Sequence, residues 1–299
     1  MAPRTERRLR TRDAIALGLL HGPAELLPIS SSAHLALVPW LLGWPYRELD
    51  GELRKAFEVA LHAGTAAALI VGRCDEAAAA ARDLDRRRAQ LIVLSLAPPA
   101  VVGFVLERPI ERRVGTPATI AAGLVGGSLA MAMADATATQ HRRREEAGAV
   151  DALLLGVAQA CALVPGVSRN GATLAAGRLR GFTREDCDVL SRNVALPVIA
   201  CATILKGARL VCRGLPDATA QAFAAGIVAS FASTLASIGV IRRVQRNHSL
   251  MPCAAYRLGL AAVVLRRLGG PEPQFGATAG RRDAAQPDPR CGDNFPDAS

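Results

Sequence analysis

The sequence predicts an all-α protein that crosses a membrane several times. Of its 299 residues 51% are hydrophobic and only 4% aromatic, and its 27 glycines suit closely packed membrane helices. Residues 116–134, 152–168 and 218–241 carry no charged side chain, and each run is close to the roughly 20 residues that cross a bilayer. The mean hydropathy of +0.22 is modest because charged ends dilute it.

About ten apolar segments follow one another along the chain. We expect all of them to be helices, because inside a bilayer only helices and closed barrels satisfy every backbone polar group. Several are short or interrupted by Pro and Gly, which predicts re-entrant or broken helices, and Pro98-Pro99 interrupts one of them. The expected helices lie near residues 13–28, 31–45, 56–73, 89–106, 116–135, 151–166, 171–181, 187–212, 218–241 and 250–268.

These segments form one integral membrane domain at residues 13–268. A basic arm at residues 1–12 precedes it. Residues 269–299, rich in Pro, Gly, Asp and Arg, predict a disordered polar tail.

The domain contains two similar stretches. Gly18-x-x-His21 leads to a Pro and a run of serines, and Gly156-x-x-Gln159 leads to a Pro and one serine. Broken helices at matching positions are typical of inverted-repeat membrane folds, in which the broken ends meet at a central site. We therefore expect two inverted repeats, roughly residues 13–135 and 151–268.

The net charge of +10 could suggest a nucleic-acid partner, but the arginines are not arranged for one. They lie in short clusters between the apolar segments, such as residues 86–88 and 142–144, as basic loops at membrane edges do. We expect membrane lipid and no nucleic acid as a partner. Because successive loops are all basic, charge does not assign the orientation of the termini.

Two polar clusters interrupt the apolar sequence, HGPAELLPISSSAH at residues 21–34 and PGVSRNGAT at residues 165–173. Ionisable groups within membrane-length apolar sequence are costly and mark function. In each cluster a Pro precedes a serine that can cap a helix, and the free N–H groups of the first turn then favour phosphate. Arg169 can hold phosphate through two hydrogen bonds.

The remaining polar groups extend this chemistry. Glu25 can hold a divalent cation through its oxygens, and His34 can transfer a proton near neutral pH. Glu58 and His62 in KAFEVALHAG are interpreted as polar groups of a helix interface rather than site residues.

The two clusters resemble the motifs of the undecaprenyl-diphosphate phosphatases, also called the bacitracin-resistance protein family. The first family motif reads roughly E-G-x-T-E-F-L-P-I/V-S-S-T-G-H and the second P-G-x-S-R-S-G-A-T. The likeness extends over residues 12–268 and includes LAPPAVVGFVL, ALPVIACATIL and MPCAAYRLGLAAVV.

The resemblance implies an enzyme that removes the terminal phosphate of undecaprenyl diphosphate, recycles the lipid carrier of cell-wall synthesis and confers bacitracin resistance. It implies a polyprenyl diphosphate lipid as substrate, a divalent cation (Mg²⁺ or Ca²⁺), and a multi-pass protein of the bacterial cytoplasmic membrane whose site faces outward. A homodimer is a further expectation. By motif position the catalytic residues are Glu25, Ser31, His34 and Arg169, the phosphate-binding residues are Ser30, Ser32, Ser168, Asn170, Gly171 and Thr173, and the metal ligands are Glu25 and His21.

The main departure from the family motif is His21, which stands where the first acid, Glu or Gln, is usual. An imidazole can bind a metal or accept a proton but is not a carboxylate, so the change could alter metal preference or activity. In the expected mechanism Ser31 is the nucleophile and His34 its base. Direct attack by water, with Ser31 only positioning phosphate, is the alternative.

Two other functions stay open at this level. One is a transporter or flippase for lipid phosphate that uses the repeat without hydrolysis, and the other is a non-catalytic binder of polyprenyl phosphate lipids.

Overall fold

The computed structural model describes residues 9–270 except 76–77, 79–81, 83, 214–216 and 246–248. Residues 1–8 of the predicted arm and residues 271–299 of the predicted tail therefore lie outside the described residues. Within the described part all regular structure is helical, apart from an isolated bridge between Arg142 and Phe182, so the predicted fold class is confirmed.

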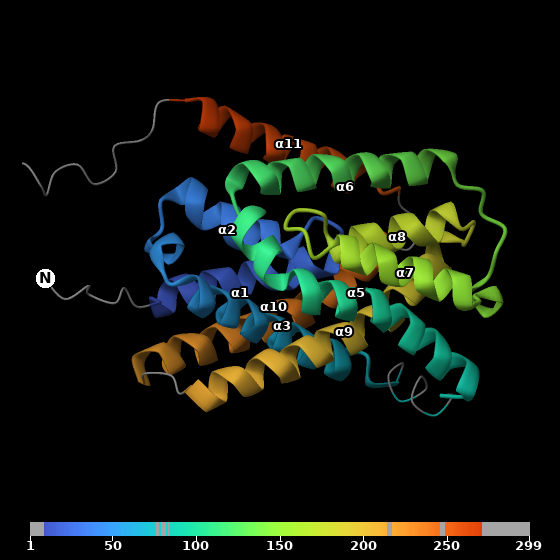
Figure 1. Ribbon diagram of the computed structural model, residues 1–299, viewed down its shortest axis with the longest axis horizontal. Helices are drawn as coiled ribbons and strands as arrows, with labels where there is room; N and C mark the ends of the chain where they lie inside the picture. The colour runs from blue at the N-terminus through green and yellow to red at the C-terminus, as the bar shows by residue number, and fades with distance from the viewer. Residues whose placement is uncertain are drawn as a thin grey trace, which may run out of the picture.

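Ten α-helices in this part correspond one to one to the ten expected segments (Figure 1). Two short 3-10 helices join them, at Pro45–Glu48 and Arg144–Glu146. The α-helices are α1 (Thr11–Leu26), α2 (Ser31–Leu42), α3 (Gly51–Gly72), α5 (Arg86–Arg113), α6 (Pro117–Thr137), α7 (Ala149–Cys161), α8 (Arg169–Leu179), α9 (Arg184–Arg213), α10 (Asp217–Gln245) and α11 (Met251–Gly269).

Four spans in the described residues are long and apolar enough to cross a membrane, within α3, α5, α6 and α10. Helices α2 and α7 are apolar but shorter. Each of these two belongs to a broken pair: residues 27–30 separate α1 from α2, and residues 162–168 separate α7 from α8.

Several helices pack lengthwise in pairs. Helix α1 lies along α10 and α7 along α5, while α6 and α11 run side by side along one edge of the molecule (Figure 1). A buried apolar cluster joins α1, α3 and α10 around Phe57, whose ring centroid is 5.1 Å from that of Phe223. This packing positions the two broken pairs. The two inverted repeats stay a prediction.

Helix α5 corrects the expectation that Pro98-Pro99 interrupts it, because the helix continues through both prolines. A proline lacks the N–H that would bond to the carbonyl four residues earlier, so Pro99 deprives the Ser95 carbonyl of its helical donor. Gln159 of α7 supplies the missing donor, with Nε2 3.3 Å from that oxygen. Gly156 allows the approach, since a Cβ there would lie only 2.8 Å from the same oxygen.

Arg257 of α11 ties the two helix breaks together. Its side chain is fully buried, and it donates to the carbonyl of Pro28 in the first break at 3.2 Å. It also donates to the carbonyls of Gly166 and Val167 in the second break at 2.8 and 3.0 Å. Loop carbonyls buried away from water need such a donor, so one guanidinium stabilises both breaks.

We expect Arg257→Leu to lower the free energy of unfolding by about 3 kcal/mol, because it leaves several buried carbonyls without a donor. Thermal or denaturant unfolding in detergent measures this. Arg266→Leu, at the exposed end of the same helix, is the matched control and should change stability by less than about 0.5 kcal/mol. Equal effects of the two substitutions would contradict the role given to Arg257.

Candidate active site

Glu25, in the last turn of α1, connects the starts of α2 and α8. Its Oε2 accepts a hydrogen bond of 2.5 Å from Ser31 Oγ, the first residue of α2. Its Oε1 forms an ion pair with Arg169, the first residue of α8. The structure thus brings together three residues from the two motifs, although 144 positions separate Glu25 from Arg169.

The residue just before each of the helices α2 and α8 is a serine with an unusual backbone conformation. Ser30 has φ 76° and Ser168 φ 66°, and among the described residues no other non-glycine residue has a positive φ. Ser30 Oγ accepts from Ala33 N at 3.4 Å and Ser168 Oγ from Gly171 N at 3.2 Å, so each hydroxyl caps its helix as predicted. Left-handed backbone at non-glycine residues is costly and gathers at functional sites.

Of the other predicted phosphate-binding residues, Asn170 lines the pocket described below, and its Nδ2 donates to the Leu26 carbonyl at 2.8 Å. Ser32 Oγ is 3.3 Å from Ser30 Oγ. Gly171 and Thr173 do not line that pocket, and neither do Ser30, Ser32 and Ser168. Thr173 is buried against Ser191 of α9, with 2.6 Å between the hydroxyl oxygens. At Gly171 a Cβ would crowd Met131 and Arg257, so this position serves helix packing.

His34 does not act on Ser31 in this arrangement, contrary to its expected role as the base. Its Nδ1 donates to the Ser30 carbonyl at 2.8 Å, and its Nε2 accepts from the Tyr256 hydroxyl at 2.7 Å. The two rings stack at 5.6 Å. The correction follows from the turn after Pro28: it directs the Ser31 hydroxyl toward α1, and α2 directs His34 toward α11.

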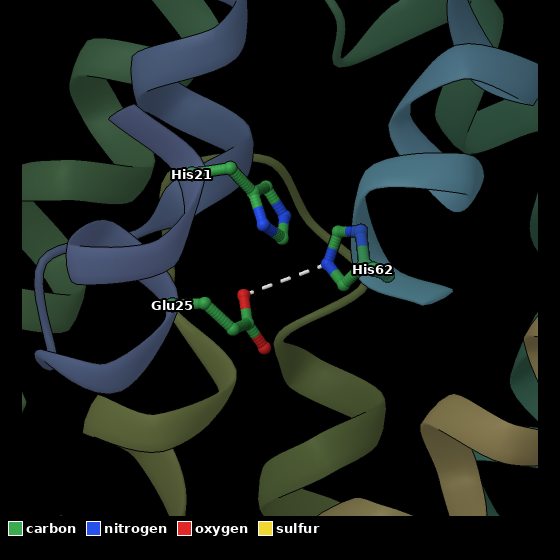
Figure 2. A group of neighbouring side chains, drawn as sticks. All are labelled: His21, Glu25 and His62. Carbon is green, nitrogen blue, oxygen red and sulfur yellow. Dashed lines mark ion pairs between the residues drawn. The ribbon is translucent and has the colours of Figure 1, made fainter. Parts of the chain in front are cut away.

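His62 of α3 joins the site, although the sequence suggested an interface role for it. Its Nε2 lies 3.5 Å from Glu25 Oε2, and its ring centroid is 4.4 Å from that of His21 (Figure 2). The neighbouring Glu58 pairs instead with Lys55 at 3.0 Å. His62 could have been found by the signal that marked Glu25, an ionisable side chain within a long apolar segment.

His21 is fully buried beside this pair, at the centre of a hydroxyl network between α1, α3 and α10. Its Nδ1 lies 2.9 Å from Thr65 Oγ1 and 3.3 Å from Ser230 Oγ. These hydroxyl partners come from residues that the motifs did not include.

His21, Glu25 and His62 could together hold a metal ion, since one potential ligand atom from each lies within 4.8 Å of the others. The donor set does not fit the expected cation, however. Mg²⁺ and Ca²⁺ prefer oxygen ligands, and two of the three donors here are nitrogens. Both oxygens of Glu25 also have protein partners.

An amphipathic pocket opens beside Glu25 and Arg169. Its polar part includes Arg73, Asn170, Ser191 and Arg192, and Arg192 pairs with Asp188. An apolar wall continues from these groups. It is lined by Leu69, Leu196, Ile199, Ile238 and Ile241. A molecule with a charged head and a long apolar chain matches both parts.

Comparison with known proteins finds relatives that match most of the chain. The family model described as "Bacitracin resistance protein BacA" matches residues 14–263. The chain is 37% identical over 264 residues to the "Undecaprenyl-diphosphatase" of Geobacter metallireducens, covering 84% of this chain and 96% of that protein. It is 38% identical over 267 residues to the protein of the same name from Geobacter sulfurreducens (85% and 97%). Identity to that of Rubrobacter xylanophilus is 34% over 270 residues (86% and 97%).

The capping serines give a test of the backbone. Ser168→Ala removes the cap and keeps the left-handed strain, whereas Ser168→Gly removes both. We therefore expect the alanine variant to be less stable than the glycine variant by about 1–2 kcal/mol, from the cost of positive φ at a residue with a Cβ. Unfolding measurements on the two purified variants decide it. The reverse order would show that Ser168 does not hold this backbone conformation.

Proposed function

The chain belongs to the bacitracin resistance protein BacA family, and we propose that Glu25, Ser31 and Arg169 form the catalytic centre of its activity. The protein is an undecaprenyl-diphosphatase, an enzyme that hydrolyses undecaprenyl diphosphate to undecaprenyl phosphate and inorganic phosphate. It thereby recycles the lipid carrier for cell-wall synthesis and confers resistance to bacitracin. The observation that carries the proposed centre is the Glu25 carboxylate, which contacts Ser31 through one oxygen and Arg169 through the other.

Ser31 is the proposed nucleophile and Glu25 its base. As Ser31 Oγ bonds to the terminal phosphorus, its proton passes to Glu25 Oε2, 2.5 Å away. The bond from phosphorus to the bridging oxygen breaks, and undecaprenyl phosphate leaves with the electron pair. Water then attacks the phosphoserine, the bond from phosphorus to Ser31 Oγ breaks, and Oγ takes the proton back from Glu25. Inorganic phosphate leaves as H2PO4⁻ with both protons of the water. A neighbouring carboxylate replaces the His34 base of the sequence-based mechanism.

Arg169 and the two helix starts stabilise the negative charge in this proposal. Phosphoryl transfer depends mainly on positioning and on electrostatic stabilisation of the transferring oxygens. Arg169 is the first residue of α8 and already lies against Glu25, so its planar guanidinium is placed to bind phosphoryl oxygens. The free N–H groups of α2 and α8 add partial positive charge.

The substrate lipid and the membrane environment suit the pocket. We propose that the diphosphate lies at its polar end and that the prenyl chain follows the wall of Leu, Ile and Ala side chains. A location in the bacterial cytoplasmic membrane with an outward-facing site is a proposal carried over from the family resemblance, and a homodimer is a separate proposal.

The divalent cation remains a proposal as well. A cation, Mg²⁺ or Ca²⁺ by the family resemblance, would neutralise charge on the diphosphate. The steps assigned to Ser31, Glu25 and Arg169 do not depend on which ion is used.

The test is phosphate release from undecaprenyl diphosphate by purified protein in detergent. We expect Arg169→Ala to lower kcat by roughly 10²–10³-fold, since one charge-stabilising donor is lost. Glu25→Gln should lower it as strongly, because an amide cannot take the serine proton. Variants that release phosphate at the wild-type rate would contradict the proposed centre, provided that unfolding measurements show them folded.

Ser31→Ala should reduce phosphate release by about 10³-fold or more, as expected for loss of a nucleophile. Ser32→Ala, next to it but bonded to Ser30 rather than Glu25, should lose clearly less. Rapid quench with labelled substrate separates the two modes of attack. Phosphoserine at position 31 supports the nucleophile, and its absence during turnover would overturn it in favour of direct attack by water.

A further inference from the structure

We propose that His21, Glu25 and His62 form a site for a divalent transition-metal ion of the Zn²⁺ or Co²⁺ class. The three side chains point toward one another from α1 and α3 (Figure 2). The inference rests on the proposed function, because Glu25 belongs to both the catalytic centre and the metal site. The test measures metal binding rather than activity, so the metal site and the catalytic centre can fail separately.

The first step is the orientation of His62. A backbone carbonyl can only accept, so the 2.8 Å contact of His62 Nδ1 with the Glu58 carbonyl places the ring proton on Nδ1. Nε2 then carries the lone pair, and it is the atom that faces Glu25 Oε2 at 3.5 Å. A hydrogen bond from the far nitrogen to a carbonyl is the usual support of a metal-binding histidine.

His21 is oriented in the same way by the hydroxyl network. Ser230 Oγ gives its proton to the Leu61 carbonyl at 2.9 Å, so it accepts from Thr65, whose oxygen lies 2.9 Å away. Thr65 can therefore accept from His21 Nδ1. This order of donors leaves the lone pair on His21 Nε2.

His21 Nε2 is the second, independent sign of a ligand. It is buried and makes no hydrogen bond within the part of the chain that the structure describes. A buried polar atom without a partner is costly, and an ion or a water molecule can supply that partner. The neighbouring groups that could complete its surroundings are Glu25 and His62.

The donor types select the class of ion. Two imidazole nitrogens and one carboxylate oxygen suit Zn²⁺ and other transition metals, whereas Mg²⁺ and Ca²⁺ favour oxygen alone. Metal–ligand bonds of about 2.0–2.1 Å hold their ligand atoms roughly 3–3.5 Å apart. The present separations, all within 4.8 Å, need only small rotations of the side chains.

Arg169 would compete with the ion, because both use the carboxylate of Glu25. The guanidinium charge also repels a nearby cation. Removal of Arg169 should therefore leave metal binding intact or strengthen it while it impairs phosphate release. This opposite response separates the metal site from the catalytic centre.

The test is titration of chelator-treated full-length protein in detergent with Co²⁺. The visible absorption of Co²⁺ reports nitrogen ligation without any need for activity. We expect one Co²⁺ per chain, displaced by Zn²⁺ but not by millimolar Mg²⁺ or Ca²⁺. His21→Gln and His62→Gln should each weaken binding by at least about tenfold. His141→Gln, which alters an exposed histidine far along the chain, should not.

Equal Co²⁺ affinity in wild type and both site variants would overturn the proposal, as would displacement of Co²⁺ by Mg²⁺ at similar concentration. Thermal unfolding of each variant shows whether it is folded. Thr65→Val, which removes the hydroxyl that supports His21 Nδ1 together with its bonds to Ser230 and Thr234, gives a second route if His21→Gln fails to fold, with a loss of about tenfold expected. Co²⁺ binding by an Arg169→Ala variant that no longer releases phosphate would support the metal site independently of the catalytic proposal.

Discussion

The structure depends on how it satisfies the backbone at two helix breaks within apolar surroundings. Inside a bilayer an interrupted helix exposes carbonyl and N–H groups that no water can reach, so protein groups must bond them. Arg257 supplies donors to carbonyls of both breaks, and Ser30 and Ser168 cap the helices that follow. Because one guanidinium serves both breaks, their relative position is fixed, and with it the distance between the two polar motifs.

This position explains why a carboxylate can lie at the end of a helix. The C-terminal end of α1 carries partial negative charge, which disfavours Glu25 there. Ser31 and Arg169, at the starts of the two following half-helices, offset that cost from opposite sides of the carboxylate. The same three groups form the catalytic centre proposed above, so the contacts that stabilise the acid also hold that centre together.

Sequence sufficed for the ten helices, because apolar length is a local signal. Isolated charge also singled out Glu25 and Arg169, which the structure brings into contact. Sequence did not suffice to predict which side chains contact one another. Ser31 and His34 lie on one helix and looked like partners, but their contacts depend on how α2 is turned: one hydroxyl meets α1, and the imidazole meets Tyr256, 222 residues away. Arg257 was visible as a charge in an apolar stretch, yet nothing local indicates that it bonds the turns near Pro28 and Gly166. The interruption predicted at the prolines of α5 was wrong for the same reason, since the donor that replaces the missing N–H lies on another helix.

Comparison of His21 with Gln159 indicates how the two halves differ. Each follows a glycine by three residues, and each contacts the helix against which that glycine packs, Ser230 of α10 for His21 and Ser95 of α5 for Gln159. These parallels extend the similarity from which the two repeats were predicted, and the inverted repeats at residues 13–135 and 151–268 stay a prediction. Their chemistry is unequal, however. Gln159 uses its amide to restore a bond lost to proline, whereas His21 is held by hydroxyls with one nitrogen left toward Glu25 and His62. The buried polar residue of one half thus bonds to the backbone, whereas that of the other half faces Glu25 and His62.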